Sequence, residues 1–357
     1  ITSFVSIDGT TEIQLIKITN LSEEEQEVTP IVAIPVYGRS ADNIRDHRHV
    51  TSLLHRIDTK ECGVEVTPVL SFDERGHQKN DTTYFVYGFT AEGNAPKEFY
   101  PTVESFIGEG GSFLIPEAVR VEKKGCTAGC HLEGKEAVGA FRFERRKLKA
   151  NESIEYVVLA GATGEKASIS KICTLFGTKE QAENELAKVK KYWTEKVNVE
   201  FETGDEATDN YLKWICFQPI LRRIYGCSFL PYHDYGKGGR DLWQDCLALL
   251  IMNPSNVRQM IVDNYGGVRI DGTNATIIGN KQGEFIADRN NITRVWMDHA
   301  FWPFVTTRLY LDQTGDMEVL FEKVPYFKDL QSMRGTAHDK FWNSEYGQKQ
   351  KTERDHI

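Results

Sequence analysis

The sequence predicts an α+β protein of several domains, with an N-terminal antiparallel β-sandwich, then linker helices, then a mainly helical region. A change of periodicity along the 357 residues carries this prediction. Up to about residue 160, apolar and polar residues alternate in short runs such as 12–18, 83–89 and 140–144, a pattern typical of strands with one buried face. Beyond that point apolar residues recur every three or four positions, which is typical of helices.

Turn-forming residues separate the expected strands. Glycine, asparagine and serine gather at residues 20–22, 74–76 and 108–111, and these residue types favour tight turns. Many short alternating strands within about 150 residues favour two antiparallel sheets packed face to face. We therefore place the sandwich domain at residues 1–162.

Two helices are expected to follow the sandwich. Residues 170–176 and 178–197 have helical periodicity, and the second run opens with the pair Thr178 and Gln181. This pair has the spacing of a capping box, in which each side chain bonds the backbone N–H of the other residue. We assign residues 163–198 to a helical linker. One stripe of the second helix carries Ala182, Leu186, Val189 and Trp193.

Residues 199–357 are expected to hold about five helices. Asn253 and Pro254 are expected to start one that runs to Tyr265, because proline suits the first turn of a helix. Gly315 is expected to end another, because glycine readily adopts the left-handed conformation that follows a helix. The expected spans are 209–225, 241–252, 253–265 and about 295–313, with a last helix from near Asp316.

Composition excludes several classes of function. The net charge is −9 and the 43 Lys and Arg residues are scattered, so there is no basic stripe for a nucleic-acid backbone. No apolar run reaches eighteen residues, and residues 1–20 alternate rather than forming a signal sequence. Neither a membrane span nor secretion is therefore expected, and the expected location is the cytoplasm.

The cysteines number seven, an odd count, and several lie in apolar helical runs. This usage fits reduced thiols in a cytosol better than a disulfide framework. Cys126, Cys130 and His131 are of the residue types that bind metals, but no second ligand pair follows at the spacing of a zinc finger or ribbon. No metal is expected.

The densest group of glycine and polar residues spans 232–245. Its glycines allow the backbone to approach a ligand closely, and Arg240, Asp241 and Asp245 supply the planar hydrogen-bonding groups that suit vicinal hydroxyls. A phosphate-binding P-loop is disfavoured, because glycine rather than serine or threonine follows Lys237. A capped turn with a salt bridge at a helix start remains the alternative.

A second group spans 288–302 and places Asp298 two residues after Trp296, near a helix start. If the indole shields the carboxyl from water, the pKa of Asp298 rises toward values useful for donating a proton. Tryptophan is also suited to stacking on the apolar face of a pyranose. The alternative is that Trp296 and Trp302 pack in the core and that Asp298 is an ordinary charge at a helix N-terminus.

These two groups, in this order and about fifty residues apart, resemble the cellobiose phosphorylase family and the related β-oligoglucan phosphorylases. The matching strings are Gly-Arg-Asp-Leu-Trp-Gln-Asp at 239–245, Trp-Met-Asp at 296–298 and Thr-Gly-Asp at 314–316. Upstream, residues 106–112 and 116–119 look like the signature of the family's sandwich domain. The resemblance is strongest in the helical region and weaker over most of the rest.

The resemblance implies a β-sandwich joined by linker helices to an (α/α)6 barrel, with residues 199–357 as the first part of that barrel. It also implies phosphorolysis of β-glucosidic bonds with inversion, giving α-glucose 1-phosphate. Asp298 would be the general acid that protonates the glycosidic oxygen, and Arg240, Asp245 and Trp296 would hold the transferred glucosyl unit. The substrates would be a β-gluco-oligosaccharide and inorganic phosphate, and no cofactor would be needed.

Because phosphate is the nucleophile in such a reaction, one protein carboxyl is enough, whereas an inverting hydrolase needs two. Cationic side chains must then neutralise the phosphate. The candidates chosen by charge and position are Lys237, His233 and Arg294.

Two other functions remain open. An inverting β-glucan hydrolase on the same barrel would need a second carboxylate, for which Asp241, Asp245 or Asp288 are available. Outside enzymes, the chain would be a carbohydrate-binding module without chemistry.

The chain departs from the common family pattern after Asp298. Many relatives carry two adjacent acids where this chain has Asp298 and His299, a variation that looks more like the large oligoglucan phosphorylases and leaves the glucosidic linkage open. The chain starts without Met and stops in a polar stretch at 345–351, so we expect a fragment. A partial barrel leaves apolar faces unburied, so we expect the fragment to be inactive and to associate, with a homodimer as the candidate assembly.

Overall fold

The computed structural model of the chain divides into two compact units, Ile1–Tyr192 and Trp193–Ile357. The division falls inside helix α5 (Lys179–Lys196), a few residues before the predicted start of the helical region. The residues that the structure describes are 1–38, 48–73, 76–164, 166–225, 239–270, 272–275, 277–278, 285–286, 298–327 and 355–356.

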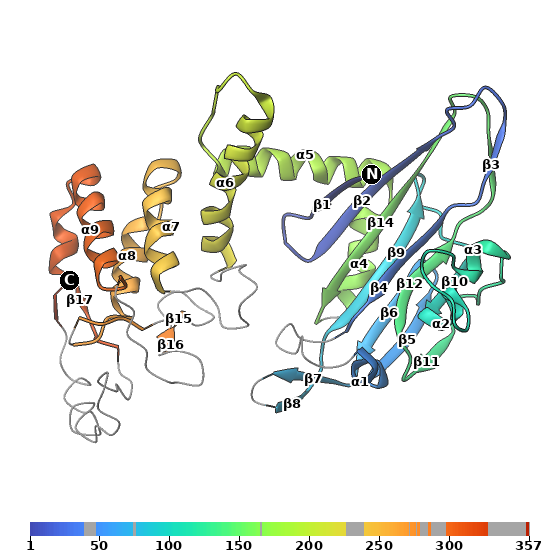
Figure 1. The fold of residues 1–357 in the computed structure, drawn as a ribbon, viewed down its shortest axis with the longest axis horizontal. Coiled ribbons are helices and arrows are strands. Elements are labelled where there is room, and N and C mark those ends of the chain that lie inside the picture. Colours follow the sequence, from blue (N-terminus) through green and yellow to red (C-terminus); the bar gives the residue numbers. More distant parts are fainter. Residues whose placement is uncertain are drawn as a thin grey trace. The chain divides into compact units, whose positions relative to one another are not determined.

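The first unit consists of antiparallel sheets and helices (Figure 1). Its helices are α1 (Arg48–Leu53), α2 (Val103–Ile107), α3 (Glu117–Arg120), α4 (Lys166–Phe176) and most of α5. Its strands are β1 (Thr2–Val5), β2 (Thr11–Thr19), β3 (Gln26–Val28), β4 (Ile31–Val36), β5 (His55–Lys60), β6 (Gly63–Pro68), β7 (Leu70–Asp73), β8 (Gly76–Lys79), β9 (Thr83–Thr90), β10 (Glu98–Thr102), β11 (His131–Glu133), β12 (Ala137–Arg142), β13 (Arg146–Leu148) and β14 (Ser153–Thr163).

The main sheet has seven strands in the order β1-β2-β14-β9-β6-β5-β11, and each neighbouring pair is antiparallel. A second antiparallel sheet has three strands in the order β10-β12-β4. The long strand β14 lies inside the main sheet, where Val158 is opposite Gln14 on one side and Gly88 on the other. The short pairs β13-β3 and β7-β8 stand outside these two sheets.

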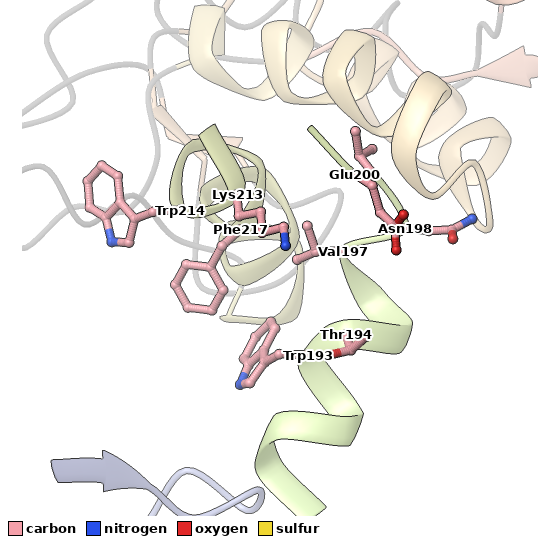
Figure 2. A pocket seen from close by; sticks show the side chains of 9 residues that line it. Trp193, Thr194, Val197, Asn198, Glu200, Lys213, Trp214 and Phe217 are labelled. Carbon is pink, nitrogen blue, oxygen red and sulfur yellow. The ribbon is translucent and has the colours of Figure 1, made fainter. Parts of the chain in front are cut away.

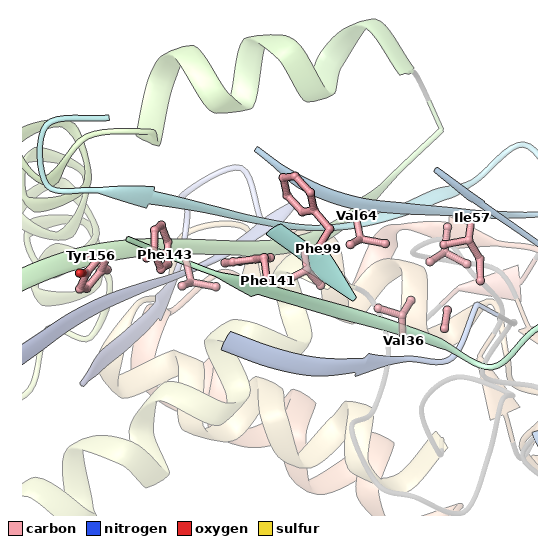
Figure 3. Packing of buried hydrophobic residues seen from close by; sticks show 11 residues of the cluster. Val36, Ile57, Val64, Phe99, Phe141, Phe143 and Tyr156 are labelled. Carbon is pink, nitrogen blue, oxygen red and sulfur yellow. The ribbon is translucent and has the colours of Figure 1, made fainter. Parts of the chain in front are cut away.

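Alternation along β14 gives the main sheet two buried faces. Val158 belongs to a buried cluster with Phe99 and Phe141, and these two rings come from the three-stranded sheet (Figure 3). Its neighbours Val157 and Leu159 belong to a second cluster on the opposite face. Successive side chains of a strand point to opposite faces, so one apolar run of β14 serves both clusters. The predicted β-sandwich is confirmed.

Helices cover the outer faces of both sheets. The second cluster includes Ile169, Ile172 and Phe176 of α4, which pack on the main sheet. On the smaller sheet, Phe106 of α2 and Ala118 of α3 pack with residues of β12. The unit is therefore built in layers, with a buried apolar layer between the sheets and another beneath each set of helices.

The predicted capping box of the linker is confirmed. The Thr178 backbone N–H donates to Gln181 Oε1 at 3.1 Å, and the Gln181 N–H donates to Thr178 Oγ1 at 3.3 Å. Helix α5 begins at Lys179, as this pair predicts.

The second unit is mainly helical in the residues that are described. Its buried cluster gathers side chains from α6, α7, α8 and α9, with Trp243 and Leu249 of α7 among its most buried members. Its helices are the end of α5, α6 (Glu206–Tyr225), α7 (Gly239–Met252), α8 (Val257–Tyr265), α9 (Phe301–Thr314) and the short 3-10 helix η3 (Met317–Phe321). Its strands are β15 (Ile277–Ile278), β16 (Phe285–Ile286), β17 (Lys323–Val324) and β18 (Asp355–His356).

Two helix starts and the type of the last helix were predicted wrongly in this unit. Helix α8 starts at Val257 and not at Pro254, because Asn256 takes a left-handed conformation with φ 67°, which a right-handed helix cannot include. Residues 298–300 form a turn, so α9 starts at Phe301 rather than near 295. The expected last helix is the 3-10 turn η3. The end of α9 was predicted correctly, since Gly315 follows it with φ 69°.

Large apolar side chains are exposed on several helices of this unit. Trp214 of α6 is 57% exposed, Ile251 of α7 79% and Phe304 of α9 68%, as expected for helices with unburied apolar faces. Among the described residues, no helix combines the length and the apolar character that crossing a membrane requires.

The close approach of β9 and β12 provides a stability test in the sandwich. A Cβ atom at Gly88 would lie 2.2 Å from the Phe141 ring, whereas one at Gly164 would meet nothing within 4 Å. We expect Gly88→Ala to lower the free energy of unfolding by about 1–3 kcal/mol, because the buried ring must move. Gly164→Ala is the matched control and should leave stability unchanged or slightly raised. Urea denaturation of both variants checks this, and equal stabilities would contradict the packing described.

Candidate functional site

Helix α7 presents Arg240 and Asp241 at its first turn. The helix starts at Gly239, and its next residues, Leu242 and Trp243, are buried in the core of the unit. Arg240 precedes both of them in the first turn of the helix, which begins at Gly239, so its side chain lies at the helix end, where the structure leaves it exposed. Arg240 is exposed and Asp241 is half-buried.

The turn at residues 298–300 presents Asp298 just before α9. The Phe301 backbone N–H donates to the Asp298 carbonyl at 3.1 Å. The next residue, His299, is buried, and its carbonyl accepts a hydrogen bond from Asn274 Nδ2 at 3.1 Å. The fully buried Arg269 donates to the carbonyl of Asn274. The turn that carries Asp298 is therefore attached to a buried polar network rather than to solvent-exposed groups.

Packing of α7 against α9 brings the two helix starts together. Thr306 Oγ1 of α9 donates to the Trp243 carbonyl of α7 at 3.2 Å, and Gln313 Nε2 donates to the Leu250 carbonyl at 2.6 Å. Later residues of α9 thus contact later residues of α7, so the two helices run parallel. The ring of Tyr265, at the end of α8, meets the ring of Trp243, near the start of α7. Helix α8 therefore runs in the opposite direction.

The site centres on an ion pair between Arg240 and Asp298. Arg240 Nη1 donates to Asp298 Oδ2 at 2.8 Å. The indole Nε1 of Trp302 donates to the same oxygen at 3.4 Å. The Arg240 side chain is 48% exposed and that of Asp298 39% exposed, so a ligand from solvent can reach both.

The electrostatics of Asp298 differ from the prediction. The hydrogen bond from Arg240 is the largest influence and holds the pKa of Asp298 below its ordinary value of 3.8, and the bond from Trp302 acts in the same direction, while partial burial opposes both. The predicted rise of the pKa is therefore wrong for this arrangement. The prediction considered the shielding by an indole, whereas a guanidinium that bonds the carboxylate directly stabilises its charge. The same bond raises the pKa of Arg240.

Of the other predicted residues, Asp241 and Asp245 lie in the described part of the chain and the rest lie outside it. Asp241 lies close enough to Arg240 for its charge to act on the guanidinium. Asp245 is buried with 3% exposure, so in this structure its carboxylate is not presented at the surface beside Arg240. The predicted residues that lie outside the described part of the chain are Trp296, Lys237, His233, Arg294 and Asp288.

Trp302 was not predicted as a member of the site. It follows Asp298 by four residues, and side chains at this spacing share a face of a helix. The spacing is visible in the sequence, but Trp296 lies nearer to Asp298 along the chain and was the predicted partner. Asn274 carried no comparable signal, because its contact with His299 depends on tertiary structure.

A separate hollow of about 510 Å³ lies where the end of α5 meets the first half of α6 (Figure 2). Its aromatic lining includes Trp193 and Phe217, whose rings meet edge to face at 4.4 Å between centroids. Lys213 and Glu200 add charged groups to its wall. None of the residues predicted to act on a sugar lines this hollow, and the sequence had not singled it out.

The thiols singled out by spacing are placed close together. Cys126 lies beside Cys130, and burial together with that neighbour raises the pKa of the Cys126 thiol to about 12. Across the described parts of the chain, no three His, Cys, Asp or Glu side chains gather in an arrangement that would hold a metal ion.

Comparison with known proteins assigns the sandwich. The family model described as the glycosyl hydrolase 94 supersandwich domain matches residues 1–179, half of the chain. The chain belongs to glycosyl hydrolase family 94. This membership covers the two sheets and the start of α5, and it confirms the resemblance noted in the sequence.

A curated relative extends the family 94 similarity into the helical unit. The chain is 23% identical over 318 residues to a cellobionic acid phosphorylase from Neurospora crassa. The match covers 88% of this chain and 37% of the relative. The chain thus spans little more than a third of the length of that protein.

The effect of Arg240 on Asp298 is directly testable. Arg240→Gln removes the guanidinium, so we expect the pKa of Asp298 to rise toward its ordinary value. Arg308→Gln removes a guanidinium that pairs with Asp312 at 2.8 Å elsewhere on α9 and should leave the pKa of Asp298 unchanged. The measurement is an NMR titration of the carboxyl ¹³C resonance, assigned by its loss in Asp298→Asn. An unchanged titration in Arg240→Gln would contradict the ion pair as the cause.

Proposed function

We propose that this protein is an inverting glycoside phosphorylase. It cleaves a β-glucosidic bond of a gluco-oligosaccharide with inorganic phosphate, gives α-glucose 1-phosphate, and catalyses the reverse synthesis. The observation that carries the proposal is the solvent-accessible carboxyl of Asp298, with Arg240 and the Trp302 indole against it. A carboxyl, a cation and an aromatic ring at one accessible point are the groups that hold and protonate a sugar.

In this reaction Asp298 is the general acid. It donates a proton to the glycosidic oxygen while phosphate attacks the anomeric carbon from the opposite face, so no second protein carboxylate is needed. Arg240, Asp241 and Trp296 hold the glucosyl unit, whereas Asp245, which is 3% exposed in this structure, lies beneath the surface that carries Arg240. The phosphate is neutralised by cationic side chains, for which the candidates remain Lys237, His233 and Arg294.

The relative directions of the helices in the second unit support this role. Helices α7 and α9 run parallel with α8 reversed between them, and alternating helices of this kind repeat in an (α/α)6 barrel. Such a barrel would gather the starts of its parallel helices at one end. Asp298 and Arg240 come from two such starts, so we place the active site there.

The relative in Neurospora crassa favours phosphorolysis over hydrolysis. It is named a cellobionic acid phosphorylase and matches 88% of this chain, including the segment that contains Asp298. Since the identity is 23%, we transfer the reaction class and leave the linkage and the acceptor to experiment.

The reaction class is tested by product analysis. The full-length protein that contains this chain is incubated with β-1,2-, β-1,3- and β-1,4-linked gluco-disaccharides, with and without inorganic phosphate. We expect glucose 1-phosphate from at least one linkage and no cleavage without phosphate. Release of free glucose from the donor unit at equal rates in both conditions would instead favour the inverting hydrolase. No cleavage of any linkage, with binding retained, would favour the carbohydrate-binding module.

The role of Asp298 is tested by substitution. In the full-length protein, Asp298→Asn should lower kcat by about 10²- to 10⁴-fold, because the amide cannot protonate the leaving oxygen. KM for the sugar should change little, since the side chain keeps its size. Asp312→Asn is the matched control: it also lies on the α9 segment, is half exposed and pairs with Arg308, and it should leave kcat unchanged. Similar rates for the two variants would remove Asp298 from the mechanism.

A further inference from the structure

The arrangement around Asp298 is not the one in which it can act as an acid. Its Oδ2 accepts hydrogen bonds from Arg240 Nη1 at 2.8 Å and Trp302 Nε1 at 3.4 Å. Both donors favour the charged carboxylate, and a carboxylate has no proton to give to a leaving oxygen. If Asp298 is the general acid, something must weaken its bond with Arg240 before the chemical step.

The charged surroundings of Asp298 are simple in the described part of the chain. Among the described residues, Arg240, from α7, is the one charged side chain that acts on its carboxyl, and Asp241 acts on Arg240 from the same helix turn. From α9 comes the neutral indole of Trp302, and His299, in the same turn, is buried. As far as the described residues determine it, the protonation state of Asp298 depends mainly on where the Arg240 guanidinium points.

A bound sugar can redirect that guanidinium. Arginine offers five N–H donors in a planar fork, and a glucosyl unit offers several hydroxyl oxygens as acceptors. Both partners of the pair are partly open to solvent, at 48% and 39% exposure, so neither is prevented by packing from exchanging partners. A sugar that covers the carboxyl also removes water from it, and loss of the cation together with loss of water favours the protonated form.

We propose that the Arg240–Asp298 ion pair is a closed resting state of the site, which a β-linked glucosyl unit opens by taking over the donors of Arg240, so that Asp298 takes up a proton as the sugar binds. This inference rests on the proposed function. It makes Arg240 a positioning residue that controls the acid, in addition to a group that holds the sugar.

The protons balance over one turnover. Solvent supplies a proton to Asp298 when the sugar binds. Asp298 passes it to the glycosidic oxygen as the bond from that oxygen to the anomeric carbon breaks and a bond from a phosphate oxygen forms. The hydrogen phosphate dianion carries its own proton into the ester, and the ester returns that proton to solvent. Asp298 is left as a carboxylate, and Arg240 pairs with it again when the products leave.

The test is calorimetric titration of the full-length protein with β-1,2-, β-1,3- and β-1,4-linked gluco-disaccharides in the absence of phosphate. These ligands do not titrate, and without phosphate no turnover is expected. Comparing buffers of different ionisation enthalpy gives the number of protons taken up. We expect an uptake approaching one proton per sugar at mildly acidic pH. Because binding takes up a proton, the affinity for the sugar should fall as the pH rises. The fall should reach up to about tenfold per pH unit between the pKa of free Asp298 and that of Asp298 in the complex.

Three variants distinguish the possible causes of proton uptake. Asp298→Asn should bind the sugar with no such uptake. Arg240→Gln should take up a smaller fraction of a proton, because the free carboxyl already has a higher pKa. Arg308→Gln, which removes the same charge from the pair with Asp312 on α9, should behave as the wild type. Circular dichroism confirms that each variant is folded.

The outcomes distinguish this inference from the function on which it rests. Sugar binding and glucose 1-phosphate release without proton uptake that depends on Asp298 would overturn the resting-state proposal and leave the phosphorylase standing. Uptake that is unchanged in Arg240→Gln would overturn the role of Arg240. Failure of every disaccharide both to bind and to yield glucose 1-phosphate would overturn the proposed function and this inference with it.

Discussion

The parallel packing of α7 and α9 is the constraint on which the candidate site depends. Arg240 and Asp298 are 58 residues apart in sequence, and they meet because Thr306 and Gln313 of α9 bond backbone carbonyls of α7. The buried side chains of α6, α7, α8 and α9 fix this arrangement, and the polar groups at the helix starts are left at the surface. A change that shifted α9 by one turn along α7, about 5.4 Å, would separate the ion pair completely.

The chemistry of Asp298 is decided by its partners more than by its residue type. The same carboxyl is a stable anion beside a guanidinium, and in the proposed mechanism it becomes a proton donor once that cation is redirected and water is removed. In the structure the anion prevails, since Arg240 and Trp302 both donate to one oxygen. The proposed catalysis by this residue therefore requires a second arrangement of Arg240, and the partial exposure of both side chains leaves room for one.

The sequence predicted those features that depend on neighbouring residues. Alternation revealed strands with one buried face, such as β2, where the buried Ile13 follows the exposed Glu12, and the Thr178–Gln181 pair predicted the start of α5. Prediction failed at the start of α8 and for the pKa of Asp298. Pro254 suits a first helical turn, yet the left-handed Asn256 delays α8. The pKa of Asp298 was predicted in the wrong direction because the Arg240 contact could not be derived from spacing.

The central claim is that Asp298 reaches the glycosidic oxygen once Arg240 has released it. The most direct measurement is a crystal structure of the full-length protein with its disaccharide substrate bound in the absence of phosphate. We expect the Asp298 carboxyl within hydrogen-bonding distance of the bridging oxygen and the Arg240 guanidinium turned onto sugar hydroxyls. A bound disaccharide whose bridging oxygen lies away from Asp298, with the ion pair still intact, would contradict the account.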